Sequence, residues 1–133
     1  MFRLSQYLHA LSDNPEQKRA SSSAGKPAGP VVIWNLIRRC NLTCKHCYAT
    51  AADKDFPGEL DTRQVFAVMD DLKASGVPVL ILSGGEPLMR PDIFEISHRA
   101  KDMGFYVGLS SNGTLIDENN IEDIVNAGYN YVG

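Results

Sequence analysis

Residues 31–48 read Val31-Val-Ile-Trp-Asn-Leu-Ile37-Arg-Arg-Cys40-Asn-Leu-Thr-Cys44-Lys-His46-Cys47-Tyr48, an apolar run followed at once by three cysteines. The apolar run has no clean alternation, which is typical of a strand buried on both faces, as in a parallel sheet. The cysteines are the only ones in the chain, and their spacing is C-x3-C-x2-C. The stretch therefore predicts a buried strand at 31–37 that leads into a thiol-rich segment, the cysteine loop (residues 40–48).

The chemistry of the cysteine loop points to a metal. Thiolates are soft ligands suited to zinc or to iron–sulfur clusters. Such clusters are usually held by four cysteines, so Cys40, Cys44 and Cys47 would leave one iron open to a ligand that is not protein. The alternative is a structural zinc site on the same cysteines with His46 or a distant residue. The spacing alone leaves the two readings close to even, although zinc sites usually pair two distant Cys or Cys/His units, and no second unit is present. A redox role for a single thiol fits less well.

Strands and helices alternate after the cysteine loop. Asp61 and Gln64 form a capping-box pattern at the start of a helix that Gly76 ends. A second helix begins near Pro91 and ends at Gly104, and a third is capped by Asp117 and ends at Gly128. Each helix has apolar residues at helical spacing, which are Val65, Val68, Met69 and Leu72, then Ile93, Ile96, Ala100 and Met103, then Ile121, Ile124 and Val125. Further strands are predicted at 77–82, 105–109 and 129–132.

This βαβαβαβ pattern predicts an α/β fold with a parallel sheet and right-handed crossovers. The strand at 129–132 would have an unpaired outer edge, which natural folds usually cover. We therefore expect the chain to be the truncated first half of a parallel barrel, spanning residues 31–133. Residues 1–19 are expected to be an N-terminal extension with a short amphipathic helix at 2–12, and the Ser/Gly/Pro-rich residues 20–30 a flexible linker.

The segments after the first three strands are the unusual ones. They are the cysteine loop, Gly84-Gly-Glu-Pro87 (the glycine loop) and Ser110-Ser-Asn112-Gly113 (the asparagine loop). Loops at the carboxyl ends of parallel strands converge on one face, where ligands bind. Each of the last two could be a plain turn. As ligand contacts, Gly84 and Gly85 would let the backbone approach closely, Glu86 would face a cation and Pro87 would stiffen the corner. Ser110 and Asn112 could bond a ribose or a carboxylate.

The composition excludes several function classes. The net charge is -3 with a pI near 5.5, and no basic patch is present, so we expect no nucleic-acid partner. No apolar run approaches the roughly 18 residues that a membrane span needs, and residues 1–10 do not read as a secretory signal. An odd number of clustered cysteines without such a signal argues against a disulfide framework and favours a reducing, cytoplasmic setting.

Taken together, these motifs resemble the radical S-adenosylmethionine (SAM) superfamily over about residues 31–133. The family signature, C-x3-C-x-aromatic-C after the first strand of a partial (β/α)6 barrel, matches Cys40, Cys44 and Cys47. His46 stands at the usually aromatic position. The glycine loop and the asparagine loop match the family's segments after the second and third strands.

The resemblance implies a [4Fe–4S] cluster on Cys40, Cys44 and Cys47, with SAM chelating the open iron. SAM-binding roles then fall on residues of the three loops. The methionine ammonium would be held by the segment Gly84, Gly85, Glu86 and Pro87, the ribose or carboxylate would lie near Ser110 and Asn112, and His46 would lie beside the adenine. The reaction implied is reductive cleavage of SAM to a 5′-deoxyadenosyl radical, with a flavodoxin or ferredoxin as electron donor.

Within the superfamily, residues 33–48 and the N-terminal Phe2-Arg-Leu-Ser-Gln-Tyr7 are most similar to the enzymes of d1-type haem biosynthesis. That likeness implies that the substrate is an iron isobacteriochlorin or another tetrapyrrole whose propionate side chains are modified. Two alternatives inside the superfamily are a haem-pathway decarboxylase and a peptide-maturing enzyme. An alternative of another class is a non-catalytic zinc-binding module. The likeness also implies that a second half-barrel and a C-terminal domain with further cysteines are absent, so the chain alone is expected to be inactive.

Overall fold

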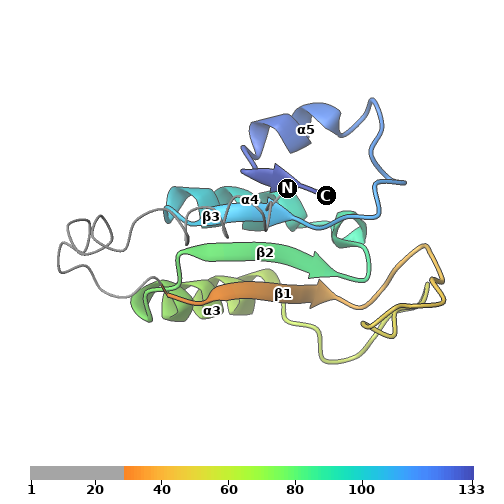
Figure 1. The fold of residues 1–133 in the computed structure, drawn as a ribbon, viewed down its shortest axis with the longest axis horizontal. Coiled ribbons are helices and arrows are strands. Elements are labelled where there is room, and N and C mark those ends of the chain that lie inside the picture. The colour runs from red at the N-terminus through yellow and green to blue at the C-terminus, as the bar shows by residue number, and fades with distance from the viewer. Residues whose placement is uncertain (1–28) are drawn as a thin grey trace, which may run out of the picture.

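Four parallel strands lie side by side in chain order and form the frame of the molecule. The computed structural model describes residues 29–133, with strands β1 (Val31–Ile37), β2 (Val79–Gly84), β3 (Tyr106–Leu109) and β4 (Tyr131–Val132). The sheet order is β1-β2-β3-β4 and every neighbouring pair is parallel (Figure 1). The predicted α/β fold is confirmed. The helical extension at 1–19 and the linker up to residue 28 lie outside the described residues.

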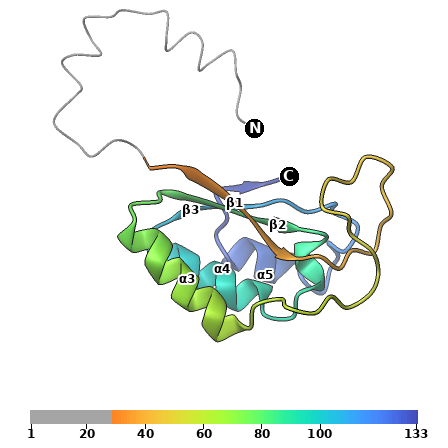
Figure 2. The same cartoon turned by 90° about the horizontal axis from the view of Figure 1, so that it is seen from below.

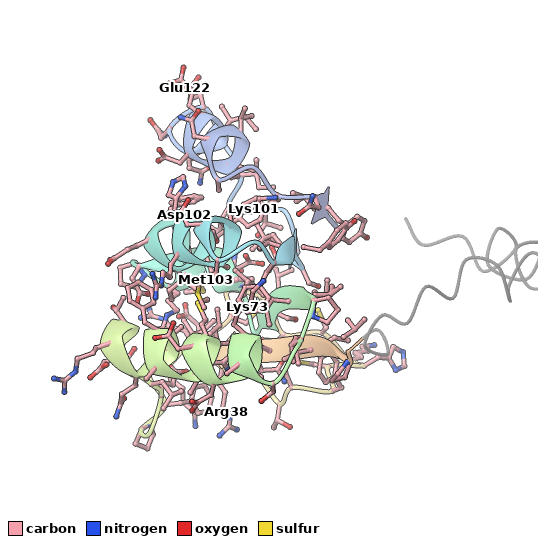
Figure 3. The ribbon with its side chains drawn as sticks, turned by 90° about the vertical axis from the view of Figure 1, so that its left-hand side faces the viewer. Arg38, Lys73, Lys101, Asp102, Met103 and Glu122 are labelled. Carbon is pink, nitrogen blue, oxygen red and sulfur yellow. The ribbon has the colours of Figure 1, made fainter. Side chains whose placement is uncertain are left out.

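The three α-helices of residues 29–133 cover the same face of the sheet. They are α3 (Thr62–Ala74), α4 (Ile93–Asp102) and α5 (Ile121–Asn126), and a short 3-10 helix, η1 (Pro87–Met89), follows β2. Figure 2 shows the helices together on one side, and Figure 3 shows them stacked, seen from the left-hand side of Figure 1. Lys73 and Lys101, labelled in Figure 3, contact the residues just before β3 and β4. Lys73 Nζ lies 4.8 Å from the centre of the Phe105 ring, and Lys101 Nζ donates to Asn130 Oδ1 at 2.8 Å. None of the helices in residues 29–133 is long and apolar enough to cross a membrane.

The predicted helix boundaries are confirmed in part. Asp61 Oδ1 accepts from Gln64 N at 2.8 Å and Gln64 Oε1 accepts from Asp61 N at 3.0 Å, which is the predicted capping box. The glycines predicted to end the helices follow them with positive φ, at Gly76, Gly104 and Gly128. Asp117 does not cap α5. Its carboxylate accepts from Asn119 N in a preceding turn, and the N-cap is Asn120.

The core lies between the helices and one face of the sheet. Strand residues of alternating position point into it, together with the helix stripes, and the fully buried members are Leu80, Leu82, Val107, Leu109, Val65, Met69, Ile96 and Ala100. The prediction that β1 is buried on both faces is wrong for its first half. Val31 is 60% and Ile33 65% exposed in the described structure, because the helices cover only one side of the sheet.

The second strand begins and ends two residues later than predicted. Val77 does not join the sheet. Its side chain is buried and its N–H donates to Leu72 O at 3.0 Å, so it caps one of the last carbonyl groups of α3. At the other end β2 continues to Gly84, which pairs with Ile37 of β1. The sheet therefore extends into the glycine loop, and the loop starts from a rigid position.

A buried ion pair fixes the turn that leads from the glycine loop into α4. Arg90 is 7% exposed. Its guanidinium donates to Leu36 O at 3.0 Å, to Leu60 O at 2.8 Å and to Asp92 Oδ1 at 2.7 Å. Thr62 Oγ1 donates to the other carboxylate oxygen of Asp92 at 2.6 Å. This network joins β1, the start of α3 and the start of α4.

Asp92→Asn should lower the free energy of unfolding at pH 7 by about 2–3 kcal/mol, because a charged hydrogen-bonded partner of a buried guanidinium is lost. Burial opposes ionisation of Asp92, but hydrogen bonds from Arg90 and Thr62 and the charge of Arg90 outweigh it, and the pKa of Asp92 is lowered. A lowered carboxyl pKa stabilises the fold above the unfolded-state pKa and ceases to do so as pH falls through the folded-state pKa. Urea unfolding of the unsubstituted protein and of Asp92→Asn, repeated from pH 7 to pH 3, measures the difference between their free energies of unfolding at each pH.

The control is Glu95→Gln, which removes the same charge from an exposed residue in the first turn of α4. Its unfolding free energy should stay within about 0.5 kcal/mol of the unsubstituted protein. An Asp92→Asn penalty that stayed constant down to pH 3 would show that the carboxylate charge is not its source.

Candidate functional site

The three unusual loops meet at the carboxyl edge of the sheet, beyond the arrowheads of β1 and β2 in Figure 1. The cysteine loop follows β1, the glycine loop ends β2 and the asparagine loop follows β3. They are joined by backbone and side-chain hydrogen bonds rather than merely placed near one another. The three loops therefore converge at one edge of the sheet, as predicted.

The start of the cysteine loop, at Arg39 and Cys40, is held by the segment that follows the loop, at Ala52. Cys40 N donates to Ala52 O at 3.2 Å, next to a parallel bridge between Arg39 and Ala52. The Arg39 guanidinium also pairs with Asp53 at 2.8 Å and with Asp55 at 3.1 Å. These contacts close a compact loop whose base packs against the sheet and whose tip faces solvent.

The cysteines differ in their surroundings. Cys40 is buried at the base of the loop, whereas Cys44 and Cys47 are exposed at its tip, and all three are free thiols. Cys47 N donates to Cys44 O at 3.2 Å, so the tip is a tight turn. His46 is exposed on the same turn.

Two of the sulfurs are surrounded by N–H donors. The pKa of the Cys47 thiol is lowered because the backbone N–H groups of Ala51, Ala49 and Thr50 face it. Cys40 Sγ accepts from Leu42 N at 3.4 Å and from Asn112 Nδ2 at 3.7 Å. The donors around Cys47 favour its thiolate, which is the form that binds metal. The chemistry of this donor set fits an iron–sulfur cluster.

The loop is not a ready-made metal site. Among residues 29–133 no group of three or more His, Cys, Asp and Glu side chains is arranged to hold a metal ion. Metal binding by all three cysteines would therefore have to draw the exposed Cys44 and Cys47 toward Cys40, in the way that metal binding often completes local folding. The same holds for zinc, so this geometry does not separate the two metals.

The glycine loop packs closely against the backbone of residues 37–39, at the end of β1. Gly85 N donates to Ile37 O at 2.7 Å and Glu86 N donates to Arg39 O at 2.9 Å. A Cβ on Gly84 would lie 2.1 Å from Ile37 O, and one on Gly85 would lie 2.3 Å from Arg39 O. These glycines thus allow β2 to dock against the segment that carries Cys40. Their expected contact with a ligand stays a prediction.

The Glu86 carboxylate is directed into the protein. It is fully buried, and Oε1 accepts from Ser111 Oγ at 2.9 Å and from Leu88 N at 3.0 Å. Oε2 accepts from Asn112 N at 2.7 Å. Pro87, also buried, begins η1 and stiffens the corner after Glu86. Glu86 therefore connects the glycine loop to the asparagine loop, and its contact with an ammonium group stays a prediction.

The asparagine loop reaches back to the cysteine loop. Asn112 Nδ2 donates to Asn41 Oδ1 at 2.9 Å as well as to Cys40 Sγ. Asn41 Nδ2 donates to Thr114 Oγ1 at 2.8 Å, and Thr114 Oγ1 donates to Asn112 Oδ1 at 2.7 Å. Ser110 is half-buried, and its N–H donates to Leu82 O at 2.9 Å.

Sequence reasoning missed four polar residues of this junction. They are Asn41, Tyr48, Ser111 and Thr114, and each has a partner on another segment that lies 13 to 73 residues away in the chain. Tyr48 Oη lies 3.3 Å from Asn35 Oδ1 and 3.4 Å from Ser83 Oγ, over the ends of β1 and β2. Their only signal in the sequence is adjacency to motif residues, and adjacency does not reveal a partner in another loop.

A family model described as the Radical SAM superfamily matches residues 34–133 of this chain. The match covers all three loops and begins inside β1. It thus includes every part of the junction that the hydrogen bonds join.

Three curated relatives are similar over most or all of the chain. Pre-heme d1 synthase of Dinoroseobacter shibae is 47% identical over 133 residues, which are 100% of this chain and 32% of the relative. Fe-coproporphyrin III synthase of Methanosarcina barkeri is 47% identical over 108 residues, 81% of this chain and 27% of the relative. AdoMet-dependent heme synthase of Oleidesulfovibrio alaskensis is 42% identical over 104 residues, 78% of this chain and 27% of the relative. The chain thus spans about a third or less of these relatives' length.

Proposed function

Because this chain belongs to the radical SAM superfamily, we propose that it forms the cluster- and SAM-binding part of an enzyme that modifies propionate side chains of a haem d1 precursor. The observation that carries the proposal is the hydrogen-bonded junction of the cysteine, glycine and asparagine loops at one edge of the sheet. The similarity to pre-heme d1 synthase over the whole chain supports the tetrapyrrole substrate.

Cys40, Cys44 and Cys47 would hold three irons of a [4Fe–4S] cluster. SAM would lie on the neighbouring loops, with its ammonium at Gly84–Glu86, its ribose or carboxylate near Ser110 and Asn112, and its adenine beside His46. A cluster held there would supply the single electron for cleaving SAM to methionine and a 5′-deoxyadenosyl radical, and that radical would take a hydrogen atom from the substrate. A flavodoxin or ferredoxin is the proposed electron donor.

The chain's own residues position this chemistry. Cys40 is buried and anchored through Arg39, so the corner of the cluster that it is proposed to hold would have a fixed place relative to the sheet. Cys44 and Cys47 are exposed at the tip and would have to approach Cys40 when the cluster binds. The glycine loop and the asparagine loop meet this corner at the edge of the sheet where SAM would bind.

Two other substrates are compatible with the same first-half motifs. One is a haem-pathway tetrapyrrole that is decarboxylated, which the similarity to Fe-coproporphyrin III synthase and AdoMet-dependent heme synthase supports. The other is a precursor peptide. A non-catalytic zinc module would use the cysteine loop but would give no role to the glycine and asparagine loops.

The deciding experiment is anaerobic incubation of the full-length enzyme that carries this chain with didecarboxysiroheme, SAM and a one-electron reductant. We expect mass spectrometry to show loss of propionate side chains together with formation of 5′-deoxyadenosine. Omitting SAM or the reductant should abolish both products, which controls for spontaneous loss.

Turnover of siroheme or of a peptide in place of didecarboxysiroheme would move the substrate to one of the alternatives. A protein that purifies with one equivalent of zinc and takes up no iron would refute radical SAM chemistry altogether.

A further inference from the structure

Asn112 uses every polar atom of its side chain within the loop junction. Its Nδ2 donates to Cys40 Sγ at 3.7 Å and to Asn41 Oδ1 at 2.9 Å. Its Oδ1 accepts from Thr114 N at 2.9 Å and from Thr114 Oγ1 at 2.7 Å. The Asn41 amide closes the ring by donating to Thr114 Oγ1 at 2.8 Å. The orientation of the Asn112 amide is therefore fixed, with one N–H directed at the sulfur.

The backbone of Asn112 is fixed independently. Glu86, which is fully buried, accepts from Asn112 N at 2.7 Å and from Ser111 Oγ at 2.9 Å. Ser111 Oγ in turn accepts from Gly113 N at 3.0 Å. A buried carboxylate with several donors is a strong anchor, because charge-assisted hydrogen bonds gain strength away from water. The sulfur contact of Asn112 is thus held from two sides.

A hydrogen bond to a ligating sulfur affects the electron affinity of a cluster. The bond stabilises negative charge on the sulfur, and the reduced cluster carries one more negative charge than the oxidised cluster. Hydrogen bonds to the sulfurs are among the features that set iron–sulfur reduction potentials. Cys40 is the buried cysteine of the three, so a donor there is less screened by water.

We propose, on the basis of the proposed function, that Asn112 is a positioning residue whose amide donates to Cys40 Sγ and thereby raises the reduction potential of the cluster. Glu86 supports this role by holding the backbone of Asn112. The role is distinct from the SAM contact that the family resemblance implies for Asn112. It predicts a change in the cluster itself, measurable without substrate.

The test is a redox titration, monitored by EPR, of the full-length protein reconstituted with iron and sulfide. The titration is done without SAM. The cluster to follow is the one whose EPR signal changes when SAM is added afterwards. Asn112→Ala should shift the midpoint potential to a more negative value. The expected change in the ratio of reduced to oxidised cluster is about tenfold, which is about 59 mV for one electron. Asn112→Asp should shift it further in the same direction, because a carboxylate replaces the donor.

The matched control is Thr114→Val. It removes the hydroxyl that contacts Asn41 and Asn112, but it keeps the Asn112 amide donor, the bond from Thr114 N to Asn112 Oδ1 and the bond from Asn112 N to Glu86, which still hold the amide in place. We expect a lower melting temperature and an unchanged potential. A second control, Asn126→Ala on α5, should change neither.

An unchanged potential in Asn112→Ala, or an equal shift in Thr114→Val, would overturn the inference while leaving the proposed function intact. Failure of the unsubstituted protein to form a SAM-responsive cluster would overturn both.

Discussion

Replacing Cys44 or Cys47 by alanine should abolish the SAM-responsive EPR signal of the reconstituted protein. Three thiolates leave one iron for SAM, whereas two would leave a second iron without a protein ligand. Both cysteines are exposed at the loop tip, so their loss creates no cavity in the core. The fold should therefore survive, and iron and sulfide content should fall together with the signal.

Lys45→Ala is the matched control, because Lys45 lies between the two cysteines on the same exposed turn. It should reconstitute like the unsubstituted protein. Retention of a normal cluster in Cys44→Ala or Cys47→Ala would mean that the cysteine loop is not the ligand set. Loss of one bound zinc rather than of iron would instead favour the zinc module.

Much of the fold follows from local sequence signals. The capping pair Asp61 and Gln64, the helix-ending Gly76 and Gly104, and the apolar stripes fix the helices, and alternation of helices with apolar runs fixes a parallel sheet. The position of the site follows as well, because parallel strands bring their carboxyl ends to one edge. These signals need only neighbours in the chain or the general geometry of α/β folds.

What the sequence does not reveal depends on contacts between distant segments. The direction of the Glu86 side chain is set by donors at Ser111 and Asn112, and no spacing rule predicts that it turns inward. The exposure of Val31 and Ile33 depends on which face the helices cover. The requirement for glycine at position 84 likewise comes from the backbone of another strand, at Ile37.

Gly84→Ala should lower the free energy of unfolding by about 3–5 kcal/mol, the sum of backbone strain and overpacking. Gly84 has φ of 143°, and its added Cβ would lie 2.1 Å from Ile37 O. That carbonyl belongs to the paired strand and accepts the hydrogen bond from Gly85 N. Neither strand can yield without opening the sheet beside Arg39, so the root of the cysteine loop should be displaced as well. Urea unfolding measures the first effect and iron uptake the second.

Gly58→Ala separates the two causes. Gly58 also has a positive φ, 85°, but an added Cβ there would meet nothing within 4 Å. Its cost should be backbone strain alone, about 1–3 kcal/mol, with normal iron uptake. If both variants lost the same free energy of unfolding, the close approach of Gly84 to Ile37 would not contribute to stability. A larger loss in Gly84→Ala, accompanied by poor iron uptake, would show that the second strand holds the cysteine loop in place through a contact that only glycine permits.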